Sequence, residues 1–279
     1  MFSLEDSAAM AKYATLHTRT EEGVLTITMN RPDKRNALNP AMMEDLTHAL
    51  IAAGDDPSCG VIVLTGAGSA FCAGLDLEHL ETLHAKTPEE HRLDSERIAR
   101  LLRTLYDVPK PTIAAVNGAA IAGGMGLATI CDFTLSVPEA KFGYTEVKIG
   151  FVPAIVSAYL RAQIGEKRSR DLLLSGRLVK AEEASEIGLV TRMVPEQDLM
   201  HETYKLAQCL LRNSPAAVQA TKRLLSEHAL HHLDQETESA IAANAEARTT
   251  DDFKEGIRAF LEKRPPEWPS LRIEKTTSR

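Results

Sequence analysis

The sequence predicts an α/β fold in which parallel strands alternate with helices and a helical region completes the chain. Short apolar runs alternate with segments of helical periodicity through the first half of the sequence. Almost every segment between about residue 197 and residue 262 then has helical spacing. This alternation implies layers of sheet and helix joined by right-handed crossovers. A chain of 279 residues is long enough for one large domain or for a domain with an appendage.

The strands are expected at apolar runs that turn-forming or charged residues bound. In chain order they are Leu16–Arg19, Val24–Met29, Val61–Leu64, Thr112–Val116 and Asp132–Ser136. Glu21, Glu22 and Gly23 are expected to form the turn between the first two strands, and Lys141 and Phe142 a further short strand.

Helices are expected where apolar residues recur every three or four positions. Asn39 and Pro40 supply an N-cap and a first-turn proline for the first helix, and Leu93, Ile98 and Leu105 mark the apolar face of the second. The expected helices are Ala41–Ala53, Thr87–Tyr106, about Gly124–Cys131, Ile155–Ile164, Lys167–Ser175 and Ala181–Ile187.

Three regions follow from this order. Residues 1–12 are expected to be a short solvated extension, residues 13–196 the α/β core, and residues 197–279 a helical region. The helices of the last region are too few and too amphipathic to bury themselves, so we expect them to cover an interface between chains.

Composition excludes several classes of protein. The net charge is −7 without a basic stripe, which argues against nucleic acid as a partner. No apolar run approaches the ~20 residues of a membrane helix, and Glu5 and Asp6 stand where a leader peptide would carry basic residues. The four cysteines form no Cys-x-x-Cys pair, as in proteins with reduced thiols. We therefore expect a cytoplasmic protein without a membrane partner.

His228, His231 and His232 are the histidines with helical spacing. Polar helix formers surround them, and no ladder of carboxylates lies nearby in the sequence. We interpret these histidines as a solvated helix face, and we expect no metal site.

Two glycine-bearing loops are the most informative feature of the chain. Ala70–Leu77 and Ala119–Gly126 each follow an apolar run and lead into a helical pattern. A strand–loop–helix unit presents free backbone N–H groups at the helix N-terminus. Two such units that face each other could hold one oxygen atom between two donors, as an oxyanion hole does. The alternative is two tight turns in a parallel sheet.

These residues together resemble the crotonase superfamily, the enoyl-CoA hydratase/isomerase family. Five segments match its motifs in order, over a stretch from about residue 13 to residue 268. They are Ile27–Leu38, Val63–Leu77, Pro111–Asp132, Lys141–Gly150 and Gly256–Arg264.

The resemblance implies a spiral of ββα units followed by a helical trimerisation region, in trimers that often pair into hexamers. It implies a coenzyme A thioester as substrate and no separate cofactor. The thioester carbonyl would lie between the backbone N–H groups of Leu75 and Gly123. Glu146 would be the catalytic acid/base, since its apolar neighbourhood should raise its pKa toward the working pH. The alternative for Glu146 is a surface glutamate that caps a turn.

One position departs from the family pattern. The hydratases of this family that use two carboxylates carry a second glutamate three residues after the oxyanion glycine, and here that position is Gly126. Glycine can neither orient water nor carry a proton. We therefore expect either a hydratase with one glutamate or a Δ3,Δ2-enoyl-CoA isomerase, in which Glu146 removes a proton from one carbon and returns it to another.

Other functions remain open on the same scaffold. Members of the superfamily also hydrolyse, decarboxylate or dehalogenate acyl-CoAs, and fold alone does not separate these reactions. A non-catalytic acyl-CoA-binding or RNA-binding protein is a further alternative. The acidic net charge argues against RNA, and Glu146 argues against a loss of catalysis.

No other acidic residue is expected to replace the missing glutamate. Asp132 follows the end of a short helix, where a structural role is expected, and Asp76 is placed to cap the next helix. The charges of Glu89, Glu90 and Asp94 suggest a solvated helix face.

The remaining substrate contacts rest on the resemblance. Lys34 and Arg35 would meet the phosphates of coenzyme A, although a solvated surface charge is the alternative for each cation. Leu101 and Leu105 are further candidates for the acyl pocket, with core packing as the alternative. The other implied contacts are Ala37, Ala73, Asp76 and Leu77 along the pantetheine and adenine, Gly124, Met125 and Phe151 at the acyl group, and Phe260 and Lys263 at a neighbouring subunit's ligand.

Overall fold

The computed structural model describes residues 13–83 and 86–271, with the side chains of residues 228–232 left out. The expected N-terminal extension therefore lies outside the described residues, as do the side chains of His228, His231 and His232. The strands are β1 Leu16–Glu21, β2 Val24–Met29, β3 Val61–Gly66, β4 Ala70–Cys72, β5 Thr112–Val116, β6 Ala119–Ile121, β7 Phe133–Ser136, β8 Lys141–Gly143, β9 Val179–Lys180 and β10 Arg192–Met193.

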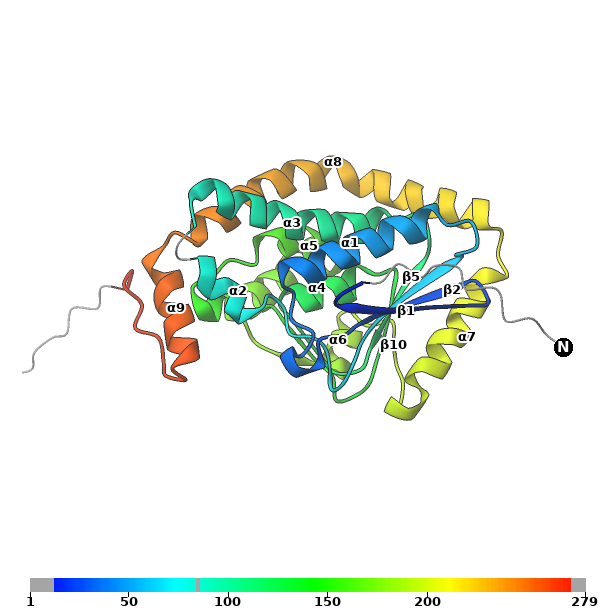
Figure 1. The fold of residues 1–279 in the computed structure, drawn as a ribbon, viewed down its shortest axis with the longest axis horizontal. Helices are drawn as coiled ribbons and strands as arrows, with labels where there is room; N and C mark the ends of the chain where they lie inside the picture. The colour runs from blue at the N-terminus through cyan, green and yellow to red at the C-terminus, as the bar shows by residue number, and fades with distance from the viewer. Residues whose placement is uncertain (1–12, 84–85, 272–279) are drawn as a thin grey trace, which may run out of the picture.

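Helices alternate with these strands, and after β10 the described elements are all helices (Figure 1). The α-helices are α1 Pro40–Asp55, α2 Leu77–Thr82, α3 Pro88–Asp107, α4 Gly123–Ile130, α5 Ala154–Ser175, α6 Ala181–Glu186, α7 Leu199–Leu211, α8 Pro215–Ala247 and α9 Asp251–Leu261. The 3₁₀ helices within the described residues include η1 Pro32–Lys34, η3 Glu146–Ile149 and η4 Glu196–Asp198.

The ten strands of the described residues form two sheets. One has the order β1-β2-β3-β5-β7-β10 and is parallel except for the β1–β2 hairpin; the other has the order β4-β6-β8-β9. The strands therefore come in consecutive twos along the chain: β3 then β4, β5 then β6, and β7 then β8. The first strand of each two joins the first sheet and the second joins the other sheet, and a helix follows. This repeat is a spiral of ββα units, so the predicted fold class is confirmed.

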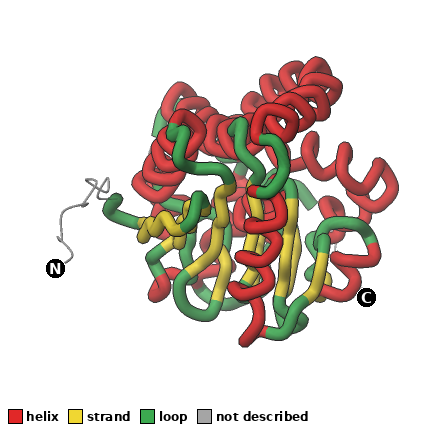
Figure 2. Tube along the Cα trace, turned by 90° about the vertical axis from the view of Figure 1, so that its right-hand side faces the viewer, coloured by secondary structure: helices red, strands yellow, loops and turns green. Residues whose placement is uncertain are grey.

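Helices cover the sheets, as the end-on view in Figure 2 shows. The first helix begins as expected, because the Asn39 side chain accepts a hydrogen bond from Met42 N at 2.9 Å and Pro40 follows it. α3 lies between α1 and the long α8 and packs against both (Figure 1). The central strands β3 and β5 are buried throughout, which explains their unbroken apolar sequences.

The C-terminal helices are joined to the α/β core. They make extensive contacts within this chain: α7 packs against β3 and β5, α8 against α3 and α5, and α9 against η3. The expected interface between chains stays a prediction. Leu199, Ala207 and Ile241 belong to the main hydrophobic core, which therefore crosses the boundary expected after residue 196. Leu224 and Leu225 stay 56% and 68% exposed. Trimer and hexamer formation remain predictions.

Smaller differences concern single elements. The strands β4 and β6 were not predicted, because three residues are too few for a periodic signal. Leu93 is 52% exposed rather than on the buried face of α3. The helix α5 contains Gly165 at φ 78°, which interrupts the helical backbone between the two helices that we expected there.

Helix α9 lies unusually close to the 3₁₀ helix η3. A Cβ atom on Gly256 would stand 2.3 Å from the backbone carbonyl of Ile149, and a Cβ on Gly150 would stand 2.4 Å from the carbonyl oxygen of Asp252. Two glycines on facing elements therefore let the backbones touch. Beyond α9, Glu255 accepts hydrogen bonds from Arg264 at 2.6 Å and from Glu267 N at 2.9 Å, which fastens the C-terminal segment to the helix.

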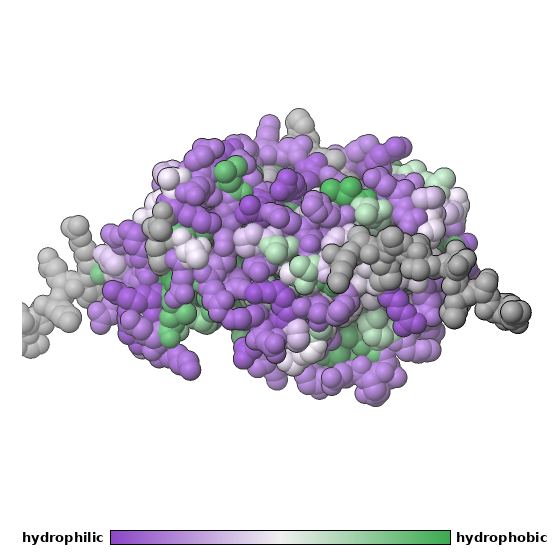
Figure 3. All heavy atoms as spheres, viewed as in Figure 1, coloured by the Kyte–Doolittle hydropathy of each residue, from purple (hydrophilic) through white to green (hydrophobic). Residues whose placement is uncertain are grey.

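Within residues 13–83 and 86–271, no helix is long and apolar enough to cross a membrane. The same described residues contain no cluster of three His, Cys, Asp or Glu side chains with metal-binding geometry. All four cysteines are free thiols, and Cys59, Cys72 and Cys131 are buried. Figure 3 shows a mostly hydrophilic face with small apolar areas.

Candidate active site

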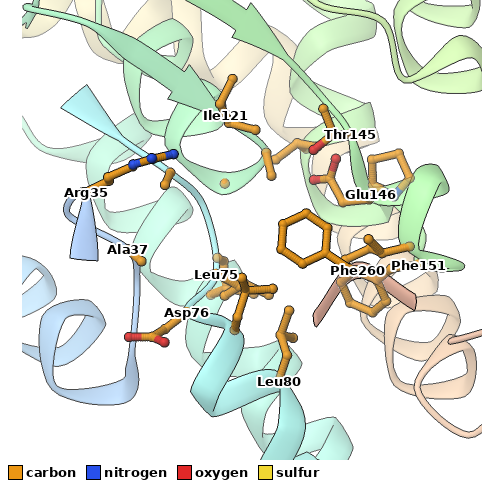
Figure 4. Close-up of a pocket in the computed structure, with 18 of the residues that line it drawn as sticks. Arg35, Ala37, Leu75, Asp76, Leu80, Ile121, Thr145, Glu146, Phe151 and Phe260 are labelled. Carbon is orange, nitrogen blue, oxygen red and sulfur yellow. The ribbon is translucent and has the colours of Figure 1, made fainter. Parts of the chain in front are cut away.

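A cavity of about 630 Å³ opens between the first half of the chain and α9. Its walls come from the loop after β2, the loop between β4 and α2, the start of α4, η3, residues 151–156, Asn244 of α8 and the end of α9. Figure 4 shows Glu146 and Thr145 across this cavity from Arg35, Ala37 and Asp76. The cavity therefore joins the segments that carry the sequence motifs.

The two glycine-bearing loops meet at the cavity. A Cβ atom on Gly74 would lie 2.8 Å from Ala122 Cβ and 3.6 Å from Gly123 N. Gly74 has φ 86°, a backbone conformation that favours glycine. Leu75 and Gly123, the two expected donors, both line the cavity. The loops are therefore neighbours in space, as the oxyanion interpretation requires.

The N–H of Leu75 is directed away from the neighbouring strand segment. The parallel bridge between Leu38 and Leu75 uses the carbonyl of Gly74, which accepts from Leu38 N at 2.7 Å, and the N–H of Asp76, which donates to Leu38 O at 2.9 Å. Successive N–H groups of an extended chain point to opposite sides. The Leu75 N–H therefore points to the side that does not pair with Leu38.

Gly123 is the first residue of α4, so its N–H has no acceptor within the helix. The preceding residue, Ala122, has φ 52° and ψ −123°, a sparsely populated conformation for a residue with a Cβ. Strain of this kind typically costs about 1–3 kcal/mol and concentrates at functional sites. Ala122 N donates to Gly143 O at 2.7 Å, which helps to hold the strained residue in place.

Glu146 is a buried carboxylate of the cavity with an oxygen atom that lacks a hydrogen-bond partner among the described residues. It begins η3 and is 8% exposed, and this oxygen atom is Oε2. Burial raises the pKa of this carboxyl to about 7, against a smaller opposing effect of a backbone hydrogen bond. A free carboxylate oxygen with a pKa near neutrality can accept and return a proton at physiological pH.

Packed side chains fill the space next to Gly126, where the second glutamate of two-carboxylate hydratases would project. A Cβ atom on Gly126 would stand 2.9 Å from Cγ1 of Val156. Val156 lines the cavity, and Gly126 does not. An apolar β-branched side chain therefore forms the wall near this turn of α4, and there is no space for a glutamate unless Val156 moves.

An exposed edge of the cavity carries the cations expected to meet phosphates. Arg35 and Lys34 both line it. Lys34 forms an ion pair with Glu78, whereas Arg35 is exposed and forms no ion pair within the described part of the chain. Arg35 is therefore the cation at this edge that is best placed to meet an anionic group.

Asp76 has the structural role that we expected for it. Its Oδ1 accepts a hydrogen bond from Glu78 N at 3.0 Å, so it caps α2, and its Oδ2 pairs with Arg31 at 2.7 Å. Asp132 likewise accepts from Thr112 N at 2.8 Å and pairs with Lys222, which explains its position between α4 and β7. Neither carboxylate replaces the second glutamate.

Most of the substrate contacts implied by the resemblance line the cavity. These are Lys34, Arg35, Ala37, Ala73, Asp76, Leu77, Phe151 and Phe260, besides Leu75, Gly123 and Glu146. Gly124, Met125, Leu101, Leu105 and Lys263 do not line it. A Cβ on Gly124 would stand 2.2 Å from Cys72 O, so this glycine serves the packing of α4 on β4. Met125, Leu101 and Leu105 lie in the hydrophobic core.

Phe260 lies at the cavity of its own chain (Figure 4). The resemblance led us to expect it at a neighbouring subunit's ligand. The close seating of α9 on η3 explains the difference, because η3 carries Glu146 and α9 carries Phe260. Leu261 lines the same wall. Both side chains are about half exposed, at 53% and 43%.

Asp94 was expected on a solvated face, and this expectation is wrong. It is only 2% exposed and pairs at 2.6 Å with the fully buried Arg248, the C-cap residue of α8. Glu89 and Glu90 are exposed, as expected. Asn244, one turn before Arg248, lines the cavity and was missed. Its spacing of four residues from both Ala240 and Arg248, on the buried face of α8, was the available signal.

Comparisons with known proteins identify the family of the chain. Residues 19–271 match the family model described as "Enoyl-CoA hydratase/isomerase". A putative enoyl-CoA hydratase of Thermus thermophilus is 47% identical over 89% of this chain and 98% of its own length. A crotonyl-CoA hydratase of Syntrophomonas wolfei is 34% identical over 90% of this chain and 96% of its own.

Solved structures give the same result at the level of the fold. The crystal structure of an enoyl-CoA hydratase/isomerase from Xanthobacter autotrophicus superposes with a TM-score of 0.83 at 31% identity, and the match covers 90% of this chain and 97% of that one. The family match spans both glycine-bearing loops, Glu146 and all of α9. The chain belongs to the enoyl-CoA hydratase/isomerase family.

Proposed function

We propose that the protein adds water to the double bond of a 2-enoyl-CoA thioester, with Glu146 as the single acid/base. The observation that supports this proposal is a buried carboxylate with a free oxygen in the same cavity as the two oxyanion loops. The names of the relatives, which are called enoyl-CoA hydratases, support the same reaction. The free thiols fit a reducing compartment, and we propose the cytoplasm.

The thioester carbonyl oxygen would accept hydrogen bonds from Leu75 N–H and Gly123 N–H. Ionised Glu146 would take a proton from a water molecule as the oxygen of that water adds to Cβ. The electron pair of the double bond would move to the thioester oxygen, where each N–H donor can stabilise the enolate by about 3 kcal/mol. Protonated Glu146 would then give its proton to Cα, which restores the carboxylate.

Isomerisation of a 3-enoyl-CoA to the 2-enoyl-CoA is the second candidate. The apolar wall that Val156 forms next to Gly126 favours it, since no second carboxylate is available there to hold water. Glu146 would remove a proton from C2 and return it to C4, and the same two N–H groups would hold the dienolate oxygen. This reaction needs one base only.

The test incubates the protein with a trans-2-enoyl-CoA and, separately, with the 3-enoyl-CoA of equal length, and follows product mass and enoyl absorbance. Hydration predicts that the 2-enoyl-CoA gains the mass of one water, and that Glu146→Gln lowers the rate by about 10²- to 10⁴-fold. A change in absorbance of the 3-enoyl-CoA without a change in mass would identify an isomerase. Water gain that Glu146→Gln leaves intact would rule out the role of Glu146.

A further inference from the structure

A buried polar cluster lies behind the cavity, where α2, α3 and α8 meet. Asp94 Oδ2 pairs with Arg248 Nη1 at 2.6 Å, and Asp94 Oδ1 contacts His79 Nε2 at 2.8 Å and Arg97 Nη1 at 3.1 Å. Burial opposes ionisation of Asp94, but the hydrogen bond with His79 and the charge of Arg248 together hold its pKa well below the usual range. Arg97 also pairs with Glu44 at 3.2 Å, so two guanidinium groups face two carboxylates, and Arg248 is the buried cation of the cluster.

Asn244 connects this cluster to the cavity. Its Oδ1 accepts hydrogen bonds from Ser95 Oγ at 2.9 Å and from Arg248 Nη2 at 3.2 Å. Its Nδ2 donates to Val152 O at 3.3 Å. An asparagine amide carries two N–H donors, so one of them has no acceptor within the described part of the chain. Asn244 is 5% exposed and lines the cavity.

The surroundings of Asn244 in the cavity are apolar. Val152, whose carbonyl accepts from Asn244, lines the same cavity, and so do the apolar side chains of Leu80, Ile98 and Val156. Phe151 also lines it, and the guanidinium carbon of Arg248 lies 5.6 Å from the Phe151 ring centroid. The Nε of Arg248 is buried without a hydrogen-bond partner in the described structure. A donor that is backed by the buried guanidinium of Arg248 thus stands among apolar side chains of the cavity.

We propose that Asn244 is a specificity-determining residue whose free N–H binds an oxygen atom on the acyl chain of the substrate. The preferred acyl group would carry a hydroxyl, carbonyl or carboxylate oxygen beyond the reacting carbons. A plain hydrocarbon chain would leave this N–H buried and unpaired, which carries a penalty that an oxygen acceptor removes. The reaction of such a substrate rests on the proposed function, whereas its binding does not.

The test measures calorimetric affinity for pairs of saturated acyl-CoAs, which have no double bond to react. In each pair the chains have equal length, and one carries a terminal hydroxyl or carboxylate. We expect the wild-type protein to bind the oxygenated member about 5- to 50-fold more tightly. If the charge of the buried Arg248 contributes to binding, the carboxylate should give a larger affinity ratio than the hydroxyl. If the hydrogen bond alone acts, the two ratios should be equal.

Two variants separate the hydrogen bond from the shape of the wall. Asn244→Leu should reverse the preference toward the hydrocarbon chain. Asn244→Asp keeps the shape but has no N–H, so it should abolish the preference and repel the carboxylate. Ser239→Ala, at an exposed position of the same helix, is the matched control and should behave as wild type. The same substrates with a 2,3 double bond should show the preference mainly in KM.

The outcomes separate this inference from the proposed function. Equal affinity for both members of every pair in the wild-type protein would overturn the role of Asn244, even if hydration is observed. This measurement uses the wild-type protein alone, so it does not depend on whether a variant folds. A preference in binding without any turnover of enoyl-CoAs would contradict the proposed function and leave the inference in place. Failure to bind any acyl-CoA would overturn both.

Discussion

At the scale of single residues, the raised pKa of Glu146 bears on both the proposed catalysis and the stability of the protein. Its carboxyl has a pKa of about 7 in the folded protein because burial disfavours the charged form. In the unfolded chain the pKa is the ordinary value of about 4.3. The folded state therefore binds the proton more tightly, and the wild-type free energy of unfolding should fall as the pH rises from about 4.5 to about 7.

Glu146→Gln should remove this pH dependence. We expect the variant to be about 3 kcal/mol more stable than wild type near pH 8, and nearly equal to it near pH 4.5. Urea unfolding of both proteins across this range measures the difference, and every other titrating group cancels in the comparison. A constant difference at all pH values would mean that Glu146 has an ordinary pKa and is not buried in the functional protein.

The burial of Glu146 was predicted from the sequence, whereas Asp94 was wrongly expected to be solvated. The two outcomes have one physical reason. Glu146 lies in a short motif whose neighbours in the sequence are also its neighbours in space. Asp94 is buried by Arg248, which is 154 positions away. A charged residue on a helix gives no local sign that a distant arginine pairs with it, so the solvated face was the natural expectation.

At the scale of elements, the contact between α9 and η3 should control both folding and binding. Gly256→Ala would place a methyl group against the Ile149 backbone, which cannot move as a flexible side chain can. We expect a loss of about 1–3 kcal/mol in the free energy of unfolding and a higher KM for acyl-CoA, because Phe260 would leave the cavity wall. Urea unfolding and steady-state kinetics measure the two effects.

Lys254→Ala is the matched control for that change, since Lys254 is exposed on the same helix. Its effect on stability should stay within about 0.5 kcal/mol. If Gly256→Ala were as harmless as Lys254→Ala, α9 would not be seated on η3 in solution.

Elements differed in how well the sequence predicted them. The central strands β3 and β5 and the helix α1 have long periodic or capped sequences, and they were predicted to within two residues of each end. The strands β4 and β6 have three residues each and were seen only as the loops they lead into. Their pairing with each other is a long-range event that no local pattern encodes.

At the scale of the whole molecule, the spiral brings distant segments to one cavity. The ββα repeat and its parallel pairing followed from the alternation of strands and helices and from the family motifs. The placement of the C-terminal helices did not follow, because an amphipathic helix can bury its apolar face on its own chain or on another. Here α7 and α8 share the main core, and α9 closes on the cavity.

The presence of Glu146 and Phe260 at one cavity has a genetic consequence. When one polypeptide supplies every residue of a site, two chains with different inactivating substitutions cannot complement each other, because neither chain contains an intact site. Glu146→Gln and Phe260→Asp, each impaired by itself, should stay impaired when they are co-expressed or refolded together. Recovery of activity in the mixed sample, measured against each variant alone, would mean that the tail of one chain serves the cavity of another.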